Sequence, residues 1–129
     1  MKLHQLLSIC ATLTLCTITN GETVIDNNLI QRMEEVGPKG TVSTLVYVVD
    51  QVDVKSLSDS ITKANMRFAD RHQLVVETLQ ATALSTQDSI LASLKNQRGA
   101  TKITPFWISN VIRVDARPDV IHELANRSD

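Results

Sequence analysis

The stretch that decides the fold is Lys102–Asp115, which reads KITPFWISNVIRVD. It contains two runs rich in β-branched and aromatic residues, Lys102–Ile108 and Val111–Asp115, which meet at Ser109-Asn110. Apolar and charged residues alternate in the second run, which indicates that one face of that strand is buried. The stretch therefore predicts two successive strands of a sheet with one covered face.

The preceding part of the chain predicts a further strand and a long helical region. Thr41–Val49 is dense in β-branched and aromatic residues, and its nearly continuous apolar run is typical of a central strand. Val54–Asn96 contains no glycine or proline and carries an apolar stripe at helical spacing, with Asp53 available to cap its start. One helix of this length would far exceed the mean of about 11 residues, so we expect a break near Asp70. Gly99 is expected to end the region in a left-handed conformation.

Two short helices flank these elements. Apolar residues in Val24–Val36 fall at helical spacing, and Asp26 or Asn27 can cap the start. The segment Gly37–Gly40 then interrupts regular structure and is expected to form a turn or hinge. Pro118 suits the first turn of a last helix, because that position does not need its missing amide.

The order of predicted elements from the first strand onward is strand, helix, strand, strand, helix. This order supplies five of the six elements of the ferredoxin-like pattern, whose last strand returns beside the first. We therefore expect an α+β fold, a ferredoxin-like antiparallel sheet with an extended helical insertion, and a last strand missing through truncation at the C-terminus. The expected organisation is a short helix and hinge over residues 22–40 and one domain over residues 41–129. An open sheet edge of this kind tends to pair with another strand.

The N-terminus is typical of an export signal. Lys2 gives a positive start, a mostly apolar stretch follows, and small residues up to Gly21 form a cleavage region. We expect residues 1–21 to be removed and the rest of the chain to be secreted. Both cysteines, Cys10 and Cys16, lie in this leader, so the exported remainder is expected to contain neither a disulfide nor a cysteine metal site.

Composition disfavours several classes of partner. A chain of 129 residues with 43% hydrophobic and 21% charged residues is ordinary globular material rather than a disordered tail. The net charge of −1 gives no basic surface for nucleic acid, and none for anionic membranes once the signal is cleaved. We therefore expect neither nucleic acid nor a membrane as a partner.

The hairpin and the last helix carry a resemblance to a known family. The matching positions are Phe106-Trp107-Ile108, Asn110, Ile112, Val114, Ala116, Asp119-Val120-Ile121 and Leu124–Arg127. Upstream, Val75–Ala83 with Gln87, and Ile25-Asp26 with Leu29, extend the match over most of the exported chain. In these positions the chain resembles the prodomains of bacillopeptidase F-like subtilases, which are propeptide inhibitors of subtilisin-type serine proteases.

The resemblance implies a propeptide that acts as an intramolecular chaperone of the protease and then as its inhibitor. The implied partner is the catalytic domain of a subtilisin-type serine protease, in cis or in trans. In the family the sheet face packs on two protease helices, and the tail after the last strand fills the active-site cleft. Here Arg127 is followed by Ser128-Asp129 without such a tail, which puts occupancy of the cleft in doubt.

The candidate protease-binding residues are Phe106, Trp107, Ile108, Asn110 and Ile112. Alternation along a strand requires Phe106 and Trp107 to face opposite ways, so one of them is available to a partner. Trp107, the only tryptophan, is either a core anchor or an exposed contact.

The sequence gives no candidate for catalysis or for a cofactor. The family's protease carries its serine, histidine and aspartate in glycine-rich contexts such as Asp-Thr-Gly, and none of these contexts occurs here. His72 and His122 lie on predicted helices among charged neighbours and are expected at the surface. No histidine pair has metal-ligand spacing. We therefore expect a non-enzymatic protein with no metal and no cofactor.

Two alternatives stay open. The stripe in Val54–Asn96 could form a coiled coil, which would make the chain a secreted helical interaction module. The chain could also be a free-standing protease inhibitor rather than part of a precursor.

Overall fold

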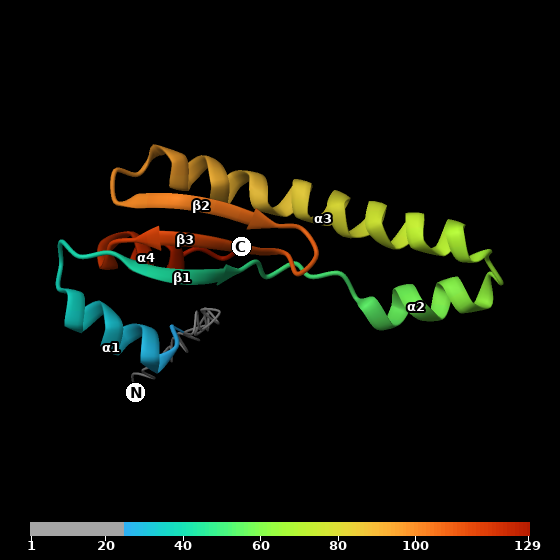
Figure 1. The fold of residues 1–129 in the computed structure, drawn as a ribbon, viewed down its shortest axis with the longest axis horizontal. Coiled ribbons are helices and arrows are strands. Elements are labelled where there is room, and N and C mark those ends of the chain that lie inside the picture. The colour runs from blue at the N-terminus through green and yellow to red at the C-terminus, as the bar shows by residue number, and fades with distance from the viewer. Residues whose placement is uncertain (1–24) are drawn as a thin grey trace, which may run out of the picture.

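The structure, a computed structural model, describes residues 25–129, and the predicted export signal lies outside them. Its elements are α1 (Asn27–Val36), β1 (Val42–Tyr47), α2 (Val54–Lys63), α3 (Phe68–Asn96), β2 (Ala100–Phe106), β3 (Val111–Ala116) and α4 (Pro118–Ala125). The strands form one antiparallel sheet in the order β1-β3-β2 (Figure 1). The predicted α+β class is confirmed, as a three-stranded antiparallel sheet with helices.

Local capping chemistry sets most helix starts as predicted. The side chain of Asp26 accepts a hydrogen bond from the Asn28 amide at 2.8 Å, and Asp53 accepts one from the Ser56 amide at 3.0 Å. Pro118 occupies the first turn of α4. Gly37 ends α1 with φ +68°, a conformation that favours glycine. These caps are local, and they confirm the corresponding sequence predictions.

The predicted break in the long helical region is confirmed near Asp70, whereas the prediction for Gly99 is wrong. The break occurs at Asn65, which adopts φ +46°, and α3 begins at Phe68, so Asp70 lies inside its first turn. Asn is among the residues that tolerate this left-handed conformation. Gly99 is not left-handed. Among the glycines of residues 25–129, a positive φ is found at Gly37 alone. Gly99 is needed for space, since a Cβ there would lie 2.7 Å from Arg117 Nε and 2.8 Å from Val120 Cγ2.

The core lies between the sheet and the helices. Figure 1 shows the sheet in front of α4, with α3 running beside β2. Alternate residues of β3 point into this core, where Ile112, Val114 and Ala116 have no exposed surface. The helices contribute apolar side chains to the same cluster, namely Met33, Ile90, Leu94, Val120, Ile121 and Leu124.

Strand β1 lies at an edge of the sheet, not at its centre. The sequence predicted a central strand from the apolar run of Thr41–Val49, but β3 is central in the order β1-β3-β2. The apolar run is divided between two faces: Val42, Thr44 and Val46 are half-buried, whereas Ser43, Leu45 and Tyr47 are exposed. One edge and one face of this strand are therefore uncovered among the described residues.

Helix α2 and the first half of α3 form an arm that extends beyond the sheet (Figure 1). Ile61 is the buried residue of α2, and Phe68 at the start of α3 is 86% exposed. The second half of α3 packs on the sheet instead, through Ile90 and Leu94, and Ala83 and Gln87 of the same half are also buried. The predicted helical stripe is therefore used inside the molecule over the last part of α3.

A buried polar cluster fixes the end of the sheet. The Asn110 side-chain amide donates to the Asp50 carbonyl at 2.6 Å and to Thr86 Oγ1 at 2.9 Å, while its oxygen accepts from Gln87 Nε2 at 2.8 Å. Gln87 Nε2 also donates to the Phe106 carbonyl at 3.2 Å. We call these five residues the Asn110 corner. It joins α3, the segment after β1, and the turn between β2 and β3.

Replacing Asn110 is expected to lower the unfolding free energy more than replacing a single exposed residue does. Asn110→Gly removes the side-chain bonds to Asp50, Thr86 and Gln87 and leaves the buried Asp50 carbonyl without its partner, so the unfolding free energy should fall by about 2–4 kcal/mol. Asn110→Ala should lose about 1 kcal/mol more, because Asn110 has φ +46° and alanine is strained there. Chemical denaturation of both variants measures this difference, and equal stability of the two variants and the unchanged chain would contradict it.

Candidate functional site: the open face of the sheet

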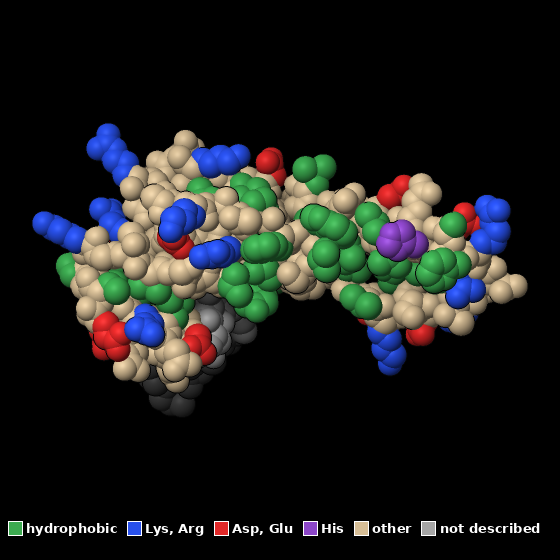
Figure 2. Space-filling view, in the orientation of Figure 1, with side chains coloured by type: hydrophobic (Ala, Val, Ile, Leu, Met, Phe, Trp, Pro, Cys, Tyr) green, Lys and Arg blue, Asp and Glu red, His purple; other side chains and the backbone are tan. Residues whose placement is uncertain are grey.

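The face of the sheet that points away from the helices is uncovered, and its side chains form three rows across the strands. The register gives the rows Tyr47–Val111–Phe106, Leu45–Arg113–Thr104 and Ser43–Asp115–Thr101. We call this surface the open face. Hydrophobic side chains gather where the sheet meets the α2–α3 arm, and Lys and Arg side chains lie over the other part of the sheet (Figure 2). The open face therefore changes from apolar to polar along the strands.

The apolar end of the open face is built by one row. Tyr47 is 71% exposed and Phe106 is 44% exposed, yet Val111 between them is buried at 4%. Directly opposed side chains in antiparallel strands lie close together, so the two aromatic rings shield the valine. Leu45 in the next row is 50% exposed and extends the apolar area. Exposed aromatic and aliphatic side chains grouped in this way are typical of protein-binding surfaces.

The polar end of the open face is held by one hydrogen bond and one ion pair. Arg113 Nε donates to Ser43 Oγ at 3.2 Å, and Lys102 Nζ lies 3.0 Å from Asp115 Oδ2. The hydrogen bond from Lys102, followed by that of Ser43, holds the pKa of the Asp115 carboxyl below its usual value. Lys102 reaches Asp115 because the register of β2 is irregular between Thr101 and Thr104. This end therefore presents ionised groups rather than an apolar surface.

Three of the five predicted contact residues lie at the surface. Phe106 is the last residue of β2, and Trp107 and Ile108 lie in the turn that follows, 36% and 66% exposed. The predicted strand Lys102–Ile108 is thus two residues too long at its end. Phe106 belongs to the open face, whereas Trp107 lines a shallow hollow with Ala83, Leu84 and Leu91 of α3. Trp107 is neither a buried anchor nor fully exposed.

The other two predicted contact residues have structural roles. Ile112 has no exposed surface because its position on β3 points into the core. Asn110 is 4% exposed and forms the centre of the Asn110 corner. Direct contact with a partner is therefore excluded for both side chains in this conformation, and they support the exposed residues from beneath.

The sequence did not identify Tyr47 and Leu45 as surface residues of the candidate site. Both were assigned to a central strand, in which they would be buried on either face. The period-two alternation in Val42–Tyr47 was the available signal, because it places Ser43, Leu45 and Tyr47 on one side. Only the position of the helices decides which side is covered.

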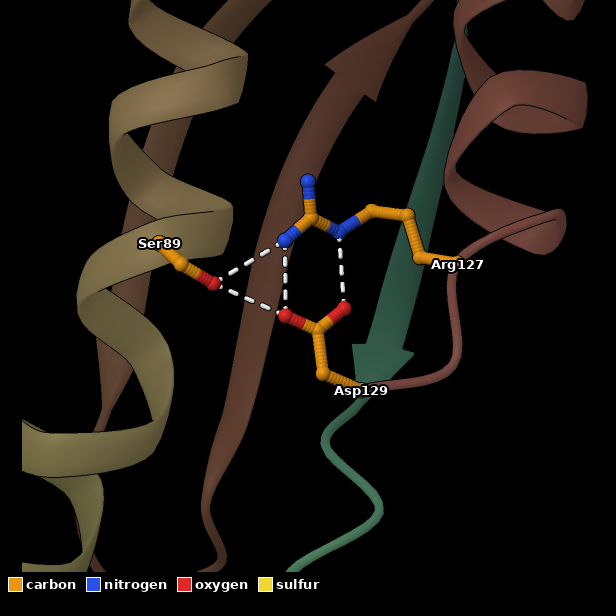
Figure 3. A network of polar contacts seen from close by, with 3 residues as sticks. All are labelled: Ser89, Arg127 and Asp129. Atoms are coloured by element: carbon orange, nitrogen blue, oxygen red, sulfur yellow. Dashed lines mark hydrogen bonds and ion pairs between the residues drawn. The ribbon is translucent and has the colours of Figure 1, made fainter.

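The end of the chain is tied to two elements. Arg127 donates to both oxygens of Asp129, at 2.8 and 2.6 Å, and Ser89 on α3 bonds to both residues (Figure 3). A main-chain oxygen of Asp129 accepts a hydrogen bond from the Val49 amide at 2.8 Å. The last residue is therefore held next to the end of β1, at the free edge of the sheet.

The described part of the chain contains no group of three or more His, Cys, Asp or Glu side chains that could hold a metal ion. His72 and His122 are exposed, as predicted. Over residues 25–129, none of the helices is both long enough and apolar enough to cross a membrane.

Comparisons of this chain with family models, with curated proteins and with solved structures find no match.

The ion pair at the chain end is expected to make stability depend on acid pH. The hydrogen bond from Arg127, with a smaller contribution from Ser89, lowers the pKa of Asp129 to about 2. A lowered folded-state pKa gives stability that is present above the ordinary carboxyl pKa and is lost as the pH falls toward about 2. As the pH is lowered from about 4 to about 2, the melting temperature of Asp129→Asn should therefore fall by a few degrees less than that of the unchanged chain.

Thermal melting at several pH values measures this slope, and Ser128→Ala in the same segment serves as the control because it keeps the carboxylate. A slope that is the same in Asp129→Asn as in the control would show that the pair contributes nothing in solution.

Proposed function

We propose that this chain is the prodomain of a secreted subtilisin-type serine protease, which assists folding of the protease and then inhibits it without catalysis of its own. The observation that carries the proposal is the open face, an uncovered sheet surface on which the exposed rings of Tyr47 and Phe106 flank the buried Val111. A surface of this kind suits a protein partner better than a small substrate, because it is broad and presents apolar side chains without a reactive group. The resemblance at Phe106-Trp107-Ile108 falls at the same end of the sheet.

We propose the ferredoxin-like pattern, lacking its last strand, as the finer fold. The order β1, helical region, β2, β3, α4 and the sheet order β1-β3-β2 agree with it. In that pattern a last strand would lie beside β1, where the free edge is found. The pair α2 and α3 corresponds to the extended helical insertion.

The proposed partner contact is the open face against the protease catalytic domain, in cis or in trans. Phe106 and Ile108 provide exposed apolar groups at one end, with Tyr47 and Leu45 beside them. Arg113 and the Lys102–Asp115 pair provide polar contacts at the other end. Apolar contacts of this kind contribute affinity, and charged groups at the margin set orientation.

The coiled-coil alternative has less support. A zipper needs its apolar stripe free for a second helix, but Ala83, Ile90 and Leu94 of α3 are buried within this molecule. A free-standing inhibitor would use the same open face, so it differs from a prodomain only in its genetic context.

The function is tested by residual activity of subtilisin-type proteases mixed with the full chain. Inhibition is expected, and Phe106→Ala should raise the inhibition constant about tenfold or more, because a few aromatic residues carry much of the binding energy of such interfaces. Tyr47→Ala, in the same row, should act in the same direction.

Phe68→Ala is the matched control, since Phe68 is an equally apolar and 86% exposed ring at the far end of α3. It should leave inhibition unchanged. Loss of inhibition in Phe68→Ala equal to that in Phe106→Ala, or inhibition unaffected by both Phe106→Ala and Tyr47→Ala while the variants stay folded, would contradict the proposed contact. No inhibition of any subtilisin-type protease by the unchanged chain would contradict the proposed function itself.

A further inference from the structure

The edge of β1 that faces away from β3 has unpaired backbone groups. The Val48 amide donates toward β3, to the Asn110 carbonyl at 3.3 Å, and the Val49 amide donates to the opposite side. Successive residues of a strand direct their amide and carbonyl groups to opposite sides. The groups of Ser43, Leu45 and Tyr47 therefore point to the free edge, where residues 25–129 provide no strand partner.

This edge lacks the features that usually protect such edges. Strand β1 reads VSTLVY, without a charged residue, a proline or an irregular register in its pairing with β3. Proteins generally block exposed edges with these devices, because an open edge pairs with other chains. Without them, the main-chain groups of this edge are available for pairing.

The first position of the edge is already paired. A main-chain oxygen of Asp129 accepts a hydrogen bond from the Val49 amide at 2.8 Å, and the bonds of Arg127 and Ser89 to Asp129 keep that residue in place (Figure 3). Asp129 therefore occupies the place that a neighbouring strand would take beside Val49. The next three paired positions along the edge, at Tyr47, Leu45 and Ser43, have no strand partner in residues 25–129.

A groove runs along the same edge. It has a volume of about 1560 Å³, and its walls come from α1, β1, α4 and the segment that follows α4. Leu29, Val46, Ile121 and Leu124 supply apolar surface to it, with Arg32 and His122 among the polar groups. Because the apolar surface lies on the helix side, a strand in this groove would direct every second side chain toward it.

We propose that the free edge of β1 binds an extended segment of another polypeptide as a fourth, antiparallel strand. In the register that continues from the Asp129–Val49 bond, the segment has apolar residues opposite Val48, Val46 and Thr44, where the groove is apolar. Polar residues lie opposite Tyr47, Leu45 and Ser43, on the side of the open face. Main-chain bonds supply affinity and the alternate side chains supply selectivity, as in other cases of strand addition.

This edge binds through main-chain groups of β1, whereas the proposed protease contact uses side chains of the open face, so a peptide that pairs with the main chain tests it independently. The probe is the synthetic heptapeptide Val-Thr-Val-Lys-Val-Thr-Lys, added to the full ¹⁵N-labelled chain. Hydrogen exchange of the Ser43, Leu45 and Tyr47 amides is expected to slow about tenfold or more on binding, because each amide gains a strand partner. The Val46 and Val48 amides point toward β3 and should change little.

Two N-methylated forms of the peptide provide the matched control. Methylation at the second, fourth and sixth residues removes the N–H groups that face β1, so binding should weaken about tenfold or more. Methylation at the third, fifth and seventh residues removes N–H groups that face away from β1, and binding should be kept. Equal binding of the two forms would overturn the proposal, and so would absence of binding by the unmodified peptide.

A variant tests the same point from the protein side. Leu45→Pro removes an amide that faces the free edge and leaves the bonds to β3 intact, so the chain should stay folded and lose peptide binding. Leu45→Val keeps the amide and should bind as the unchanged chain does. A free chain that already forms a dimer with slow exchange at Ser43, Leu45 and Tyr47 would overturn the proposal in favour of a second copy on this edge.

Discussion

The side chain of Asn110 holds together three parts of the chain that are distant in sequence, and the position of the sheet depends on it. It bonds to Asp50 after β1, to Thr86 and Gln87 on α3, and lies in the turn between β2 and β3. Buried polar groups are strongly destabilising when their partners are lost, so the cluster is satisfied only when all three parts meet in one arrangement. That arrangement fixes the turn that carries Trp107 and Ile108, and with it the apolar end of the open face.

Local chemistry allowed much of the fold to be predicted from the sequence. The caps at Asp26 and Asp53 and the start of α4 at Pro118 depend only on neighbouring residues, and each is found where expected. Tertiary contacts decided the features that were predicted wrongly. The apolar run of β1 indicates a strand but not its place in the sheet, and Gly99 is required by the close approach of Arg117 and Val120, which are distant from it in sequence.

The candidate site was predictable only in part, for a related reason. Alternation identifies which residues share a face, yet the covered face is fixed by helices elsewhere in the chain. Phe106 was found because its aromatic run ends at the turn, whereas Tyr47 was missed because β1 was expected at the centre. Ile112 and Asn110 belong to the same segment as Phe106, but they support the surface and do not form it.

The sheet leaves two surfaces uncovered, a face with an apolar row and an edge with unpaired backbone groups. Both depend on the Asn110 corner, because it sets the ends of β1, β2 and β3 relative to α3. Hydrogen exchange of the Asn110 side-chain amide in the ¹⁵N-labelled chain tests this arrangement most directly. The account predicts exchange about tenfold or more slower than that of the exposed Asn126 side chain, since the Asn110 amide is buried and bonded to Asp50 and Thr86. Equal exchange rates for the two side chains would contradict it.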